Sequence, residues 1–163
     1  MKPQDIVVLL KIILYKGSAW QSKELAAKLH ISPSEVSKSL QRSEYAGLIN
    51  AERGVARQAL MEFIQYGLSY VFPAKPGSMV NGVLTAHSHP YMAKYFSSSM
   101  KYVWADAKGY DRGLEIEPLY ENAVKAVKED EQLYKILALI DVIRVGRVRE
   151  MKLAIDELKK EIL

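Results

Sequence analysis

Residues 23–42 read KELAAKLHISPSEVSKSLQR, and this stretch predicts two short helices joined by a tight turn. In the first helix, Leu25, Ala26 and Leu29 form an apolar stripe at helical spacing. The second helix has a clear start at Ser32-Pro33-Ser34-Glu35, which supplies an N-cap serine, a proline at the first helical position and a capping-box glutamate. The stretch therefore predicts a helix-turn-helix.

The second helix has two different faces. Val36 and Leu40 give it an inward apolar stripe. Short hydroxyl groups lie beside longer amide and cationic groups on its other faces, at Ser34, Ser37, Lys38, Gln41 and Arg42. A helix with such an outer face suits the major groove of DNA. We expect Lys38 and Arg42 to reach guanine edges or phosphates, Gln41 an adenine edge, and the serines phosphates.

Residues 20–49 resemble the helix-turn-helix of winged-helix bacterial transcription regulators, especially the MarR-like branch. That family shows E-L-A-x-x-L, a turn, S-x-x-x-V-S-x-x-[IL]-x-x-L, and then G-L-[IV] leading into a strand. The matching positions are Glu24-Leu25-Ala26, Leu29, Ile31-Ser32, Val36-Ser37, Leu40 and Gly47-Leu48-Ile49. His30 departs from the usual turn glycine, although histidine is enriched at positive φ. Ser43 replaces a core leucine, which indicates a looser helix end or different packing there.

The resemblance implies a sequence-specific regulator of transcription, a repressor, that binds double-stranded DNA. The flanking contacts to the DNA backbone would come from Lys23, Lys28, Arg53 and Arg57. Terminal helices form the dimer in MarR-like proteins, so the resemblance also implies a homodimer that suits a two-fold operator.

The net charge of +4 is concentrated at one end of the sequence. Residues 1–60 carry nine Lys and Arg against five Asp and Glu, whereas residues 61–163 carry 14 of each. The whole excess therefore belongs to the segment with the helix-turn-helix, as expected for a surface that faces phosphates. An excess of this size also occurs on ordinary solvated surfaces.

The composition excludes several classes of protein. Half of the residues are apolar, which argues against disorder, and no cysteine is present to form a disulfide, a thiol nucleophile or a metal ligand. The apolar run from Ile6 to Leu14 follows Asp5 and contains Lys11, so it is too short and too charged for a membrane span or a signal peptide. We expect a cytoplasmic protein that does not interact with membranes.

The fold class predicted for the 163 residues is α+β: a mostly helical winged-helix domain with a small β element and C-terminal helices. Residues 1–72 would form the DNA-binding domain, with a first helix over residues 3–15 and a C-cap at Gly47. A helix over residues 57–67 would separate a strand at Leu48-Ile49 from a returning strand at residues 69–72. Alternatively, Arg53-Gly54 is itself the tip of the wing.

Residues 73–118 are rich in Gly, Pro, Ser and Tyr and predict a strand- and loop-rich elaboration, with short apolar runs at 80–84, 102–104 and 114–116. Helical spacing returns over residues 121–128, 130–145 and 147–163. The helix at 130–145 is apolar nearly all round and therefore needs cover on both faces. Residues 119–163 would either cap the core or form the dimer.

Two groups of residues outside the helix-turn-helix are candidate functional sites. His87 and His89 would face the same way on an extended chain and hold a metal with Asp106 or Asp111; the alternative, which we favour, is that both histidines hydrogen-bond the backbone. The second group spans the break between the last two helices. Arg147 and Arg149 would form an anion site or a docking patch for a partner, whereas an Asp141–Arg144 ion pair at i, i+3 would make this region a structural junction.

No catalytic motif is present: there is no glycine-rich phosphate loop, no G-x-S-x-G sequence and no evenly spaced pair of carboxylates. We therefore expect neither an enzyme nor a cofactor. The main alternative to a regulator is an antitoxin-like or other interaction module, built on a winged helix, that binds a protein partner through its C-terminal helices.

Overall fold

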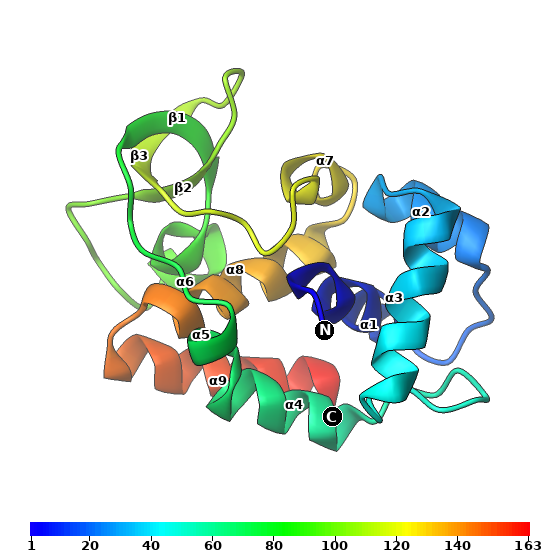
Figure 1. Cartoon of the computed structure of the whole chain (residues 1–163). Helices are drawn as coiled ribbons and strands as arrows, with labels where there is room; N and C mark the ends of the chain where they lie inside the picture. Colours follow the sequence, from blue (N-terminus) through cyan, green and yellow to red (C-terminus); the bar gives the residue numbers. More distant parts are fainter.

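The computed structural model describes all residues from 1 to 163. It confirms the α+β class, with nine α-helices and one small three-stranded sheet. Figure 1 shows the helix-turn-helix (α2 and α3) at one end of the molecule and the sheet at the other, with α1 and α8 between them. The helices are α1 (Pro3–Leu14), α2 (Ser22–Leu29), α3 (Pro33–Tyr45), α4 (Arg57–Tyr66), α5 (Leu68–Val71), α6 (Pro90–Ala93), α7 (Ala123–Val127), α8 (Glu131–Val145) and α9 (Val148–Ile162).

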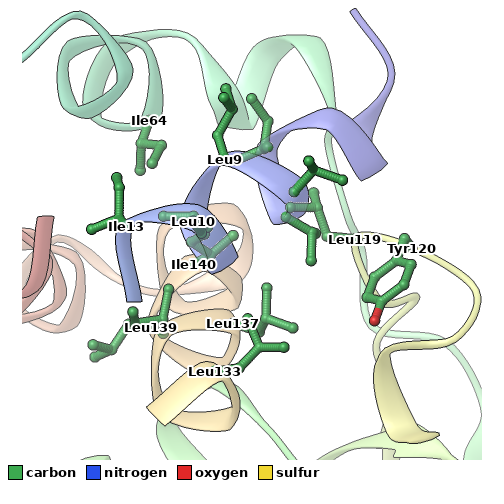
Figure 2. Packing of buried hydrophobic residues seen from close by; sticks show 14 of the residues in the cluster. Leu9, Leu10, Ile13, Ile64, Leu119, Tyr120, Leu133, Leu137, Leu139 and Ile140 are labelled. Carbon is green, nitrogen blue, oxygen red and sulfur yellow. The ribbon is translucent and has the colours of Figure 1, made fainter. Parts of the chain in front are cut away.

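The core is built around α8, whose apolar residues point in all directions. Leu133 is buried, and so is every residue from Ile136 to Ile143. Figure 2 shows Ile140 of α8 beside Leu10 of α1, with Leu137 and Leu133 further along α8. Helices α1, α5, α7 and α9 all contact α8, so its own chain covers both of its faces. Each fully buried leucine or isoleucine contributes about 2 kcal/mol to stability.

The local signals in residues 22–47 produce the predicted helices. His30 ends α2 in the left-handed conformation, with φ at 53° and ψ at 40°. The Ser32 hydroxyl accepts a hydrogen bond from the backbone N–H of Glu35 at 3.1 Å and caps α3. The C-cap of α3 is Ala46 rather than Gly47, and Gly47 follows it with a φ of +71°. Glycine adopts this φ without steric cost, which lets the chain turn sharply away from α3.

The hairpin after α3 is shorter than the one predicted from the sequence. Ile49 and Val55 form a single antiparallel bridge, and the turn between them is closed by a 2.7 Å hydrogen bond from the Gly54 N–H to the Asn50 side chain. The prediction of a returning strand over residues 69–72 is wrong, because residues 68–71 form α5. Leu68 is buried against α8, and this packing outweighs the strand preference of Tyr, Val and Phe in that segment. The alternative, with the wing tip at Arg53-Gly54, matches the structure.

The sheet closes on itself with three strands: β1 (Met79–Leu84), β2 (Tyr102–Ala105) and β3 (Asp111–Glu115). β1 pairs antiparallel with both others, and β2 and β3 pair in parallel where Tyr102 lies opposite Leu114. Gly82 takes part in both antiparallel ladders, opposite Ala105 and Asp111. The backbones approach so closely here that a Cβ on Gly82 would overlap the carbonyl oxygen of Trp104.

Further contacts join the two ends of the chain. α9 packs along α8 and also contacts α4, and α7 contacts α2. One apolar cluster of 35 buried residues runs from Ile6 in α1 to Ile162 in α9. None of the helices combines the length and the apolar character that a membrane crossing requires.

Candidate nucleic-acid interface

Four of the predicted contact residues form an open stripe on α3. Ser34, Ser37, Lys38 and Gln41 are all exposed, and they follow one another at helical spacing on the side that faces away from α1. The Lys38 side chain is 61% exposed, and its only ionic contact is a 3.8 Å approach to Glu35. Exposed pairs of this kind contribute little, so the Lys38 ammonium group is free to move to another partner.

Arg42 differs from the prediction that it reads DNA, because it is held inside the fold. Its Nε and Nη2 atoms donate hydrogen bonds of 2.9 and 2.7 Å to the two carboxylate oxygens of Asp5 in α1. Asp5 is completely buried, and only 26% of the Arg42 side chain is exposed. Such a bidentate pair fixes the guanidinium group, so Arg42 anchors α3 to α1. The prediction that Arg42 contacts DNA is therefore not supported, because its guanidinium group is already bound to Asp5.

The charge state of this pair follows from its hydrogen bonds. Burial alone would raise the pKa of Asp5, but the hydrogen bonds from Arg42 and from the backbone N–H of Lys2 outweigh it. The pKa of Asp5 is therefore lowered. The hydrogen bond to Asp5 also raises the pKa of Arg42. Both groups stay ionised near neutral pH, and the ion pair is stable there.

Arg42→Ala should therefore reduce stability rather than remove a DNA contact. The substitution leaves the Asp5 carboxylate buried without its cation, and we expect the free energy of unfolding to fall by about 2 kcal/mol at pH 7. Because the folded-state pKa of Asp5 is lowered, the pair stabilises the fold above the unfolded pKa of about 3.9, and this contribution is lost as the pH falls. Urea unfolding of both proteins at several pH values should show the difference shrinking below about pH 4. A constant difference would contradict this role for Arg42.

The departure at Ser43 has a packing explanation. Ser39 and Ser43 are both fully buried on the side of α3 that faces α1. Neither hydroxyl group forms a hydrogen bond. Small side chains on this side leave room for the Arg42–Asp5 pair between the helices. A leucine at position 43 would compete for that space.

Of the four cations predicted to contact the DNA backbone, three are accessible and one, Arg57, is bound within the fold. Lys23 and Lys28 are exposed on α2, as a backbone contact requires. Arg53 lies at the wing tip with a φ of 63°, and its guanidinium carbon is 5.0 Å from the centre of the Trp20 ring. Arg57 departs from the prediction: its Nη1 donates a 3.1 Å hydrogen bond to the carbonyl oxygen of Ile162, so it joins α4 to the end of α9.

Arg53 also lies between two hollows. One, of about 220 Å³, separates α3 from the wing and includes Gln41 and Asn50. The other, of about 450 Å³, is lined by Trp20, Arg57 and the end of α1. The first hollow is continuous with the exposed stripe of α3, because Ser37 and Gln41 belong to both.

The exposed surface of α3 includes one residue that was not predicted from the sequence, Tyr45. Tyr45 is 97% exposed and lies four residues after Gln41, so it extends the stripe by one helical turn. The i, i+4 spacing from Gln41 was a usable signal. Glu44, also exposed, is the acidic member of the same surface.

The two histidines take the alternative role, as hydrogen-bonding groups in a turn. The His87 Nε2 lies 2.8 Å from the carbonyl oxygen of Met100, and the His89 Nδ1 accepts a 3.1 Å hydrogen bond from the backbone N–H of Tyr91. No cluster of three or more potential ligands surrounds them. Burial and the nearby charge of Lys135 lower the pKa of His89 to about 4, so this imidazole is neutral at pH 7.

The Asp141–Arg144 pair is a structural junction. Asp141 accepts hydrogen bonds from the Thr85 hydroxyl at 2.8 Å, the Trp104 indole at 2.6 Å and Arg144 at 2.8 Å. Arg144 also donates to the backbone carbonyl oxygens of Phe72 and Glu117. Burial raises the pKa of Asp141, opposed by the charge of Arg144. This group of residues ties α8 to the sheet and to the loops beside it.

Comparison with protein-family models, curated proteins and solved structures gave no match for this chain. The resemblance of residues 20–49 to MarR-like regulators is therefore an expectation from the sequence alone.

Proposed function

We propose that the chain is a DNA-binding regulator of transcription, a repressor, that places α3 in the major groove. The observation that supports this is the open stripe of Ser34, Ser37, Lys38 and Gln41, whose side chains are exposed and make no hydrogen bond to their own fold. Arg42 and Asp5 hold the opposite side of α3 rigidly against α1. A helix that is already held rigidly loses little backbone freedom on binding.

Each side chain has a role that follows from its chemistry. Gln41 would pair with an adenine through its amide, and Lys38 with a guanine edge or a phosphate. Ser34 and Ser37 would donate to phosphates, which sets the register of the helix without reading sequence. Lys23, Lys28 and Arg53 would supply the charge contacts to the backbone on either side. A homodimer would repeat these contacts on a two-fold operator, and selection from a random DNA pool would reveal that symmetry.

The direct test is the double variant Lys38→Ala/Gln41→Ala, measured on the duplex recovered by such a selection. We expect affinity to fall about 10- to 100-fold, and the slope of log affinity against log salt concentration to fall by about one because one phosphate or base-edge cation is lost. Lys75→Ala removes an exposed charge far from α3 and serves as the matched control. Unchanged affinity together with an unchanged salt slope would rule out α3 as the reading helix.

A second candidate function is an interaction module that binds a protein, and one observation favours it. Once Arg42 is neutralised by Asp5, the outer side of α3 carries the cation Lys38 and the exposed acid Glu44, so it is nearly neutral. A polar helix face without excess positive charge also suits a protein partner. A selection that enriches no duplex, combined with co-purification of a partner that Lys38→Ala/Gln41→Ala abolishes, would establish this alternative.

A further inference from the structure

Cations and aromatic rings occur together on α6, on the segment that follows it and on the start of α9. Figure 1 shows α6 and the start of α9 on the opposite side of the molecule from α3. The guanidinium carbon of Arg149 lies 5.9 Å from the centre of the Phe96 ring, which joins the start of α9 to the segment after α6. The Lys94 ammonium is 5.9 Å from the centre of the Tyr91 ring, and the Tyr91 and Tyr95 rings are 5.8 Å apart. We call this surface the α6–α9 patch; it consists of Lys94, Tyr95, Phe96, Arg147, Arg149 and Lys152.

The α6–α9 patch has more cations than acids, and its acidic neighbour on α9 is the exposed Asp156, one helical turn after Lys152. The four cations of the patch are exposed, and none of them takes part in an ion pair. The nearest acid in sequence, Glu150, accepts a 2.9 Å hydrogen bond from the backbone N–H of Arg147 at the start of α9. Glu157, which accepts a hydrogen bond from Tyr91, is paired with Lys160 and Lys135. The patch therefore suits an anionic partner.

The aromatic rings narrow the class of partner. Tyr95 is 53% exposed, so one part of its ring is open to a ligand, and three exposed serines at 97–99 follow it with hydroxyl groups. Exposed cations beside an exposed aromatic ring suit single-stranded nucleic acid, because cations neutralise its phosphates while its unpaired bases stack on aromatic rings. Duplex DNA keeps its bases paired and stacked, and an acidic peptide has no base to place on Tyr95.

We propose that the α6–α9 patch binds single-stranded nucleic acid. Arg149 and Lys152, one turn apart on α9, hold phosphates, and Tyr95, next in sequence to the Phe96 that Arg149 contacts, stacks on a base. This site is separate from α3 and does not depend on the function proposed for it.

The test uses a fluorescent oligothymidylate of about twelve nucleotides, with binding followed by fluorescence anisotropy at low salt. We expect saturable binding that Arg149→Ala/Lys152→Ala weakens at least about tenfold. Tyr95→Ala should weaken it about tenfold through lost stacking, whereas Tyr95→Phe should bind like the native protein. Lys75→Ala/Lys125→Ala removes the same charge from exposed positions elsewhere and should have little effect.

Three outcomes would overturn the proposal. The first is no saturable binding of the oligothymidylate by the native protein. The second is an equal loss in Lys75→Ala/Lys125→Ala, because binding would then depend on net charge alone. The third is equal competition by polyglutamate or by a duplex of the same length, with no effect of Tyr95→Ala, which would make the patch a general site for polyanions or acidic proteins.

Discussion

Asp141→Asn is expected to lower the free energy of unfolding by about 3 to 5 kcal/mol. Asparagine keeps the shape of the side chain and an oxygen that accepts hydrogen bonds from Trp104 and Thr85. It removes the negative charge beside Arg144, whose side chain is only 4% exposed. A buried guanidinium without a counter-ion costs most of this free energy, because Asp141 is the one carboxylate that pairs with Arg144.

Chemical denaturation followed by far-ultraviolet circular dichroism measures this loss. The double variant Asp141→Asn/Arg144→Met removes both charges and should recover part of the lost stability, since a neutral pair does not leave a buried ion. The recovery separates the effect of the charge from the loss of packing. A loss below about 1 kcal/mol in the single variant would show that the backbone carbonyl oxygens of Phe72 and Glu117 are enough to hold Arg144.

Gly82→Ala is expected to disrupt the closed sheet. The added methyl group would overlap the Trp104 carbonyl oxygen, and the backbone of Gly109 also packs directly against Gly82. β1 must move away from β2 to accept the methyl group, and the ladder that pairs Val83 with Trp104 would be lost. We expect the free energy of unfolding to fall by about 3 kcal/mol.

Gly77→Ala is the matched control for Gly82→Ala. A Cβ at Gly77 would lie 3.6 Å from the carbonyl oxygen of Glu115, which is an ordinary van der Waals distance. Its effect should stay within about 0.5 kcal/mol. The near-ultraviolet circular dichroism of Trp104 should change in Gly82→Ala and remain native in Gly77→Ala. Similar stability of the two variants would mean that β1 and β2 are not packed as closely as described.

Signals confined to a few neighbouring residues carried most of the correct predictions. The start of α3 follows from Ser32 and Pro33, and the end of α2 follows from the tolerance of His30 for positive φ. The apolar residues of α8 on every side predicted a helix covered on both faces, which the contacts with α1 and α9 confirm. These features depend on capping and periodicity, and both are visible within one or two helical turns.

The errors concern partners that are distant in the sequence. Arg42 is separated from Asp5 by 37 residues and Arg57 from Ile162 by 105, and no local pattern shows that these cations are already bound. In the sequence, Asp5 looks like an ordinary acidic residue in the first turn of a helix. Its role as a buried counter-ion depends on the packing of α1 against α3, which the sequence does not show. The parallel pairing of β2 with β3 depends likewise on tertiary closure of the sheet.

The unequal surroundings of the two tryptophans give the molecule a pair of intrinsic optical reporters. Trp20 is half-buried under the cationic group of Arg53, whereas Trp104 is enclosed and bonded to a carboxylate. Iodide, a negatively charged quencher, is attracted to the first indole and shielded from the second. The emission that iodide removes therefore belongs to the wing, and the emission that survives belongs to the interior, so the two regions can be followed separately without any label.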